Sequence, residues 1–228
     1  MHVKKTFYHL GIDETTLGVG SGNLITVLAQ TQNENLIDFS YNAYKKAKNY
    51  ILENPSGVVF PSLTRMREQG LEKFHWVRVH GGRYKPRELQ HASIARVVRV
   101  NGYRPDNVVL HVDAFESRHD RTRFIIKELL KRNDFPIHEK QILVWGSGDR
   151  SVPIINFADL LAAQIGLDLY ETYQQYGMRK PRFQYKKCEV DFKKERTLSI
   201  TPQDRALFSL VLESYKPVGL KNKRRLKS

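Results

Sequence analysis

Three apolar segments of the sequence each lead into acidic residues. Continuous apolar runs of four to eight residues are typical of strands buried in an α/β sheet. Segments with helical spacing of apolar residues separate these runs, which predicts strands and helices arranged around one sheet. The three strands and their acids are Val3–Ile12 with Asp13 and Glu14, Val108–Val112 with Asp113, and Gln141–Trp145 with Asp149.

The remaining segments complete an α/β domain. Two further strands are expected, with one predicted helix between them in the sequence. Helices are also expected after most of the later strands. The expected strands are Asn23–Gln30 and Phe74–His80, and the expected helices are Ser40–Asn54, Arg87–Val100, Arg121–Lys131, Pro153–Leu169 and Pro202–Ser214. The fold class is therefore α/β, with a central mixed β-sheet flanked by helices.

The charge of the chain indicates a polyanionic partner. The 38 Lys and Arg residues exceed the 24 Asp and Glu residues by 14, and such an excess is typical of proteins that contact nucleic acid. We therefore divide the chain into a catalytic domain, 1–176, and a basic C-terminal extension, 177–228, with one helix and a cationic tail. Phosphate neutralisation needs only positioned cations, so the densest basic stretch is expected to bind nucleic acid through Arg179, Lys180, Arg182, Lys186 and Lys187.

Cys188 is the only cysteine in the sequence, which excludes an internal disulfide and a multi-cysteine metal site. The first residues lack the apolar core of a signal peptide, and no apolar stretch has the length of a membrane span. These features predict a soluble protein of the cytoplasm that has no membrane partner.

The acids at the strand ends predict a metal-dependent hydrolase. Strand ends at one edge of an open α/β sheet meet in a common crevice, and several carboxylates there repel one another unless cations bridge them. Hard oxygen ligands favour Mg²⁺ or Mn²⁺. In a basic protein, this combination indicates cleavage of phosphodiester bonds with two divalent ions.

Three stretches of the sequence resemble the ribonuclease HII family. Gly11-Ile12-Asp13-Glu14 looks like the end of that family's first strand, and Arg104–Asp113 resembles its Pro-Asp turn and the strand that ends in the third acid. Asp149–Ala158 resembles the fourth acid, followed by a proline and an apolar helix. The resemblance covers roughly residues 5–170 and implies a ribonuclease H-like fold. It also implies that Asp13, Glu14, Asp113 and Asp149 bind metal.

Two departures from the family pattern bear on the substrate and on the fourth acid. Thr15-Thr16-Leu17-Gly18 stands where the family has Ala-Gly-Arg-Gly, a surface that contacts the ribose at an RNA–DNA junction. In addition, Asp159 lies on the expected last helix, as in a broader group of ribonuclease H-like proteins that begin with Ile-Asp-Glu. The catalytic set is therefore expected to include Asp159 beside Asp149 or in its place.

Two functions remain open from the sequence. The first is a metal-dependent endonuclease that acts on RNA, RNA–DNA hybrid or DNA. The alternative is a protein of the same fold that binds nucleic acid without cutting it, as a component of a larger nucleoprotein assembly. His111 and His119 are weaker candidates for a proton-transfer role next to the acids.

Overall fold

A mixed sheet of six strands forms the centre of the computed structural model, which describes residues 7–15, 23–54, 58–80, 86–114, 119–174, 197–199 and 210–211. The order across the sheet is β5-β4-β1-β2-β3-β6. The strands are β1 (Tyr8–Thr15), β2 (Asn23–Thr31), β3 (Lys73–His80), β4 (Val108–Asp113), β5 (Ile142–Trp145) and β6 (Thr197–Ser199).

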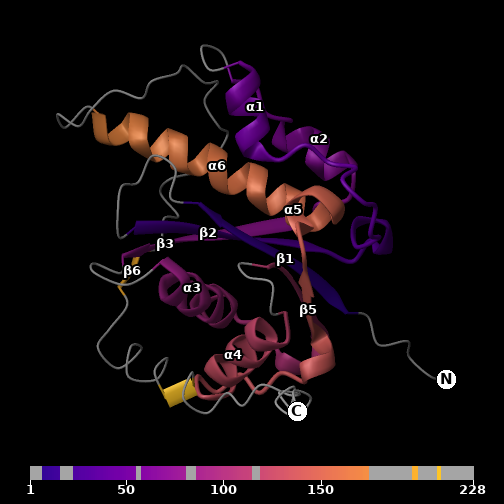
Figure 1. Ribbon diagram of the computed structural model, residues 1–228, viewed down its shortest axis with the longest axis vertical. Helices are drawn as coiled ribbons and strands as arrows, with labels where there is room; N and C mark the ends of the chain where they lie inside the picture. The colour runs from indigo at the N-terminus through magenta and orange to yellow at the C-terminus, as the bar shows by residue number, and fades with distance from the viewer. Residues whose placement is uncertain are drawn as a thin grey trace, which may run out of the picture.

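Helices cover both faces of the sheet (Figure 1). On one face α6 crosses the strands, with α1, α2 and α5 beside it, and α3 and α4 lie on the other face. The helices are α1 (Ala47–Glu53), α2 (Leu63–Glu68), α3 (Pro86–Val100), α4 (His119–Lys131), α5 (Gly148–Ser151) and α6 (Pro153–Gln174). The α/β architecture expected from the sequence, a mixed sheet flanked by helices, is confirmed.

The strand directions bring the predicted acids to one edge of the sheet. Strand β1 is antiparallel to β2, and β2 is antiparallel to β3. Strand β1 is parallel to β4, and β4 is parallel to β5. The carboxyl ends of β1, β4 and β5 therefore lie together.

Alternation of side chains along the strands produces two apolar cores, one on each face. Leu10 and Ile12 of β1 are fully buried against α3 and α4. In β2, Ile25 and Val27 are buried on the opposite face, under α6. Because successive side chains of a strand point to opposite faces, Gly11 and Asp13 of β1 lie on the α6 side.

Gly11 marks the place where β1 and α6 touch through their main chains. A Cβ atom at this position would lie 2.3 Å from the carbonyl oxygen of Ile154 and 2.9 Å from the nitrogen of Ile155. Only glycine permits so close an approach of a strand to a helix backbone. Thus β1 and α6 are in direct main-chain contact two residues before Asp13.

The helix expected over Ser40–Asn54 is wrong in its first half, because α1 begins only at Ala47. The 38–46 segment instead lies against α5, where the Ser40 N–H donates to the Ser151 carbonyl at 2.8 Å and the Tyr44 N–H donates to the Arg150 carbonyl at 2.8 Å. A helix beginning at Ser40 would have directed the Tyr44 N–H to the Ser40 carbonyl instead.

The C-terminal part of the chain reaches the sheet at one described place. Strand β6 pairs with β3 in parallel, and Val211 is fully buried in the core cluster that includes residues of α3 and α4. The predicted boundary at residue 176, the basic stretch 179–187 and most of the expected helix 202–214 lie outside the described residues. Within the residues that the structure describes, no helix is both long and apolar enough to span a membrane.

Candidate active site

The ends of three strands and two helices place five acids in one region. Asp13 and Glu14 lie near the end of β1, and Asp113 is the last residue of β4. The short helix α5 directly follows β5 and carries Asp149, and α6 carries Asp159 over β1. The structure therefore brings together all five acids named from the sequence, including both candidates for the fourth position.

Burial and the charges of neighbouring acids raise the pKa values of four of the five carboxyl groups. Burial, followed by the charges of Asp159, Glu14 and Asp113, raises the pKa of Asp13 well above its usual range. Burial and the charges of Asp113 and Asp159 raise the pKa of Glu14 to about 8. Burial and the charge of Asp149 raise the pKa of Asp113 to about 6 and that of Asp159 to about 6. The five acids thus form one electrostatically connected group, the carboxylate cluster.

Main-chain amides from distant parts of the sequence hold two of these carboxylates in place. The Gly148 N–H donates to Asp113 Oδ1 at 2.6 Å, and this bond joins α5 to the end of β4. The Ala47 N–H donates to Asp159 Oδ2 at 2.6 Å, at the first residue of α1. Hydrogen bonds to the charged form of a carboxylate favour it and offset part of the effect of burial.

Glu14 has one satisfied and one unsatisfied carboxylate oxygen. Gln90 of α3 donates from Nε2 to Glu14 Oε1 at 2.7 Å. The other oxygen, Oε2, is buried and accepts no hydrogen bond from the described residues. A buried carboxylate oxygen without a donor is costly, and a cation is the partner that would satisfy it.

Lys46 brings a positive charge into the carboxylate cluster. Its Nζ lies 3.0 Å from Asp149 Oδ2, and its charge also lowers the pKa values of Asp113 and Asp159. Asn156 holds this arrangement, because its Nδ2 donates to the Lys45 carbonyl at 3.0 Å and to the Asp149 carbonyl at 2.7 Å. Lys46 was not predicted as a site residue from the sequence, where it falls next to Lys45 inside the expected helix Ser40–Asn54.

The donor set suits a hard divalent cation, although the side chains are turned toward other partners. Among the described residues, no three His, Asp or Glu side chains are arranged so that they could hold an ion as they stand. The carboxylate oxygens instead face Lys46, Ala47 and Gly148. Several carboxylates with raised pKa values and the unpartnered Glu14 Oε2 fit Mg²⁺ or Mn²⁺ in chemistry. Coordination would require these side chains to turn inward.

The two histidines considered from the sequence lie in different surroundings. His111 is buried, and both of its ring nitrogens have partners: Trp145 Nε1 donates to Nδ1 at 3.3 Å, and Nε2 lies 3.0 Å from Nδ1 of His9. Burial and His9 lower the pKa of His111 to about 3, which keeps the ring neutral. His119 begins α4, and its ring lies beside Gly146 in the turn after β5.

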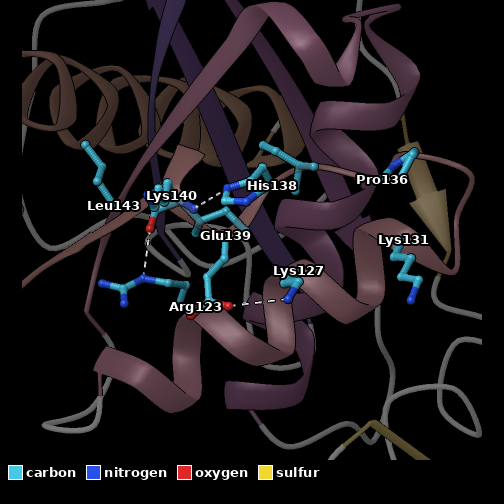
Figure 2. A pocket seen from close by; sticks show the side chains of 10 residues that line it. Arg123, Lys127, Lys131, Pro136, His138, Glu139, Lys140 and Leu143 are labelled. Carbon is cyan, nitrogen blue, oxygen red and sulfur yellow. Dashed lines mark hydrogen bonds and ion pairs between the residues drawn. The ribbon is translucent and has the colours of Figure 1, made fainter.

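A basic groove lies farther along α4. The predicted nucleic-acid-binding residues Arg179, Lys180, Arg182, Lys186 and Lys187 lie outside the described residues. The structure instead shows a groove of about 760 Å³ between α4 and the edge strand β5 (Figure 2). The cations that line it are Arg123, Lys127, Lys131 and Lys140.

The groove has one internal ion pair and one anchored guanidinium. Lys127 Nζ lies 3.3 Å from Glu139 Oε2, and the Arg123 Nε–H donates to the Ile142 carbonyl at 3.0 Å (Figure 2). Arg123, Lys127 and Lys131 are four residues apart along α4 and therefore share one helix face. These cations outnumber the single acid and form a surface suited to an extended anion.

Comparison with known proteins supports the architecture. The chain is similar to the structure of the PCNA:RNase HII complex from Archaeoglobus fulgidus, with a TM-score of 0.50 and 14% identity over 97% of this chain and 98% of that chain. It is also similar to the ribonuclease H2 from Pyrococcus horikoshii OT3, with a TM-score of 0.43 and 14% identity over 91% of this chain and 100% of that chain. No protein-family model and no curated protein sequence matches the chain. The first likeness shows a ribonuclease H-like fold.

Proposed function

We propose that this chain, with its ribonuclease H-like fold, is a divalent-metal-dependent endonuclease that hydrolyses phosphodiester bonds in RNA, RNA–DNA hybrid or DNA. The observation that carries the proposal is the carboxylate cluster, in which two buried and three half-buried acids lie together at one edge of the sheet. Such a cluster destabilises a fold in the absence of cations. A protein that only bound nucleic acid would gain nothing from keeping it.

The acids Asp13, Glu14, Asp113, Asp149 and Asp159 would hold two Mg²⁺ or Mn²⁺ ions. When bound, such ions activate the attacking water and stabilise the leaving 3′ oxygen. Lys46 neutralises Asp149 in the absence of ions. In a complex with both ions bound, its ammonium group would be free to pair with an oxygen of the scissile phosphate.

The basic groove supplies the electrostatic part of the proposed binding surface. Helix α4 begins at His119, next to the turn that leads to Asp149, and its cationic face runs away from that point. Residues four apart on a helix are separated by a rise of about 6 Å. A nucleic-acid strand that leaves the carboxylate cluster along this face would meet Arg123, Lys127 and Lys131 in turn.

A cleavage screen tests the proposal directly. Labelled RNA, DNA and RNA–DNA hybrid are incubated with the chain and Mg²⁺ or Mn²⁺, in parallel with Asp13→Asn and Asp113→Asn. We expect both substitutions to reduce cleavage by at least about 100-fold while nucleic-acid binding in Ca²⁺ is retained. The matched control is Asp134→Asn, an exposed acid at the far end of α4. Unchanged cleavage in either cluster variant would refute the assignment.

The same screen separates Asp149 from Asp159. Both acids interact electrostatically with the remainder of the cluster. We therefore propose that the site uses both, so that Asp149→Asn and Asp159→Asn each reduce cleavage. If one of the two variants retains full activity, that acid is structural and the other completes the site.

The alternative function is a non-cleaving nucleic-acid-binding component of a larger assembly. It predicts salt-sensitive binding through the cationic surfaces and no metal-dependent turnover on any substrate. The screen distinguishes the two functions, because the wild-type chain either cleaves at least one substrate or binds without cleaving.

A further inference from the structure

Three aromatic rings form a column beside the carboxylate cluster. Phe39 stacks on Trp145, with ring centroids 5.7 Å apart and planes 12° from parallel. The Trp145 ring is also nearly parallel to the His111 ring, with planes 5° apart and centroids 6.1 Å apart, and the hydrogen bond between these two rings sets them edge to edge. Phe39, the outermost ring, is 51% exposed, whereas His111 is buried. Among the described residues, Trp145 is the only ring that stacks on Phe39, and Phe39 otherwise remains half exposed.

Hydrogen bonds fix the inner part of the column. The Trp145 indole N–H donates to His111 Nδ1 at 3.3 Å. The proton of the neutral His111 ring is therefore on Nε2, which donates to His9 Nδ1 at 3.0 Å. These two hydrogen bonds fix the orientation of the His111 ring and, through it, that of the Trp145 ring.

The outer ring is positioned by the main chain. Ser40, the residue after Phe39, donates its N–H to the Ser151 carbonyl of α5 at 2.8 Å. Helix α5 also carries Asp149, so the segment that presents Phe39 is bonded to the element that presents an acid of the cluster. The exposed ring is thus fixed in place before any ligand binds.

The column lies one strand away from an acid of the cluster. Trp145 pairs in register with Asp113, and the Ala114 N–H donates to the Trp145 carbonyl at 2.8 Å. Neighbouring strands are about 4.8 Å apart. A phosphate held at the cluster would therefore have its flanking nucleotide near the open end of the column.

We propose that Phe39 is a stacking platform for an unpaired nucleobase next to the scissile phosphate. This inference rests on the proposed function and adds the class of substrate: a nucleic acid with a single-stranded or splayed nucleotide at the cut site. A flat ring stacked on a second flat ring matches the face of a base, and the net charge of +14 attracts the phosphates that such a base carries. The interior bases of a duplex have no free face to offer.

A binding assay in Ca²⁺ tests the platform without cleavage. The probes are a short fluorescein-labelled single strand, the same strand in a fully paired duplex, and single strands with one abasic nucleotide at successive positions. We expect Phe39→Ala to weaken binding of the intact single strand by about 5- to 150-fold, the range of base–aromatic stacking. Phe39→Trp should retain wild-type affinity, whereas Phe39→Leu, which is apolar but not planar, should behave like Phe39→Ala.

The abasic series supplies the decisive comparison. At one position the missing base should weaken wild-type binding and leave Phe39→Ala unaffected, so that the two proteins bind that strand equally. Tyr41→Ala is the matched control, because Tyr41 is 81% exposed in the same segment and stacks on no other ring of the described residues. We expect it to bind like the wild type, and the effect of Phe39→Ala to be smaller on the duplex.

The outcomes separate the platform from the nuclease. If the wild type neither binds nor cleaves any nucleic acid, the proposed function is wrong and the platform is wrong with it. If the wild type cleaves but Phe39→Ala binds every probe equally well, only the platform is wrong. The platform is also wrong if Tyr41→Ala loses as much affinity as Phe39→Ala. It is wrong as well if Phe39→Ala binds more weakly than the wild type to every strand of the abasic series. Urea unfolding of each variant identifies any loss of affinity that is due to a lost fold.

Discussion

Replacing Glu14 by Gln should stabilise the metal-free chain at high pH and have no effect at low pH. In the folded chain the pKa of Glu14 is about 8, whereas the ordinary value is 4.5. A carboxyl group whose pKa is raised by folding holds its proton more tightly in the folded state than in the unfolded state. The free energy of unfolding therefore falls as the pH rises from about 4.5 to about 8. Glutamine cannot ionise, so Glu14→Gln removes this dependence.

The size of the effect follows from the same two pKa values. They differ by about 3.5, and each unit corresponds to about 1.4 kcal/mol, which gives an upper bound of about 5 kcal/mol at pH 8 and above. Repulsion among the remaining acids persists in the variant, and their protons redistribute. We therefore expect a measured gain of about 2–5 kcal/mol at high pH. The hydrogen bond from Gln90 should persist, because the side-chain oxygen of glutamine also accepts.

Urea unfolding in EDTA measures this prediction at several pH values between about 5 and about 8.5. The matched control is Glu68→Gln, an exposed residue of α2, which should leave the pH dependence unchanged. Adding Mg²⁺ at high pH should stabilise the wild type more than Glu14→Gln, since bound cations offset the repulsion. If wild type and Glu14→Gln lose stability in parallel as the pH rises, Glu14 does not carry the proposed penalty and our electrostatic account of the cluster is wrong.

Three further variants test other parts of the structure. Gly11→Ala should lower the free energy of unfolding by about 3 kcal/mol in urea, because its Cβ would lie 2.3 Å from the Ile154 carbonyl oxygen. Lys46→Met should destabilise the metal-free chain by about 1–3 kcal/mol at high pH and little in Mg²⁺, as measured by urea unfolding, because it leaves Asp149 without its ammonium partner. The double substitution Lys127→Glu and Lys131→Glu should weaken nucleic-acid binding. It should also make the plot of log affinity against log salt concentration less steep, with the magnitude of the slope reduced by about 2, as measured by fluorescence anisotropy.

Each of these predictions has a matched comparison. A Cβ atom at Gly102 would meet no atom within 4 Å, and only the positive φ of this residue disfavours alanine. Gly102→Ala should therefore lower the free energy of unfolding by about 1 kcal/mol. If it lowers this free energy as much as Gly11→Ala does, the main-chain contact at Gly11 is contradicted. Arg65→Glu with Arg67→Glu, on the opposite face of the sheet from α4, should change the salt slope less than the pair in the groove. For Lys46→Met, an unchanged stability in EDTA would contradict the ion pair.

The sheet and its strand ends were predictable because their signals are local. An apolar run such as Val108–Val112 indicates a buried strand from its own residues alone, and the acid that follows the run must lie at the end of that strand. The parallel order of β1, β4 and β5 then places Asp13 and Asp113 at the same edge. The sequence named both Asp149 and Asp159 but left open which of them approaches the other acids, because that depends on how α6 crosses β1.

The contribution of the 38–46 segment could not be predicted, because its interactions are with residues far away in the sequence. Local pattern favours a helix from Ser40, but hydrogen bonds to Ser151 and Arg150 hold the chain against α5 instead. Lys46 reaches Asp149 and Phe39 reaches Trp145 only as a result. Both partners are more than 100 positions away, beyond what any window along the sequence can show.

The contact at Gly11 has a consequence for how this protein can change over evolution. Because β1 and α6 meet through their main chains, no side chain sets the separation between the strand that carries Asp13 and the helix that carries Asp159. Apolar residues elsewhere in the two cores can be exchanged in size and shape while the distance between these two acids is preserved. Sequences that share this architecture should therefore diverge freely across most of their length, yet keep a glycine two positions before the first acid.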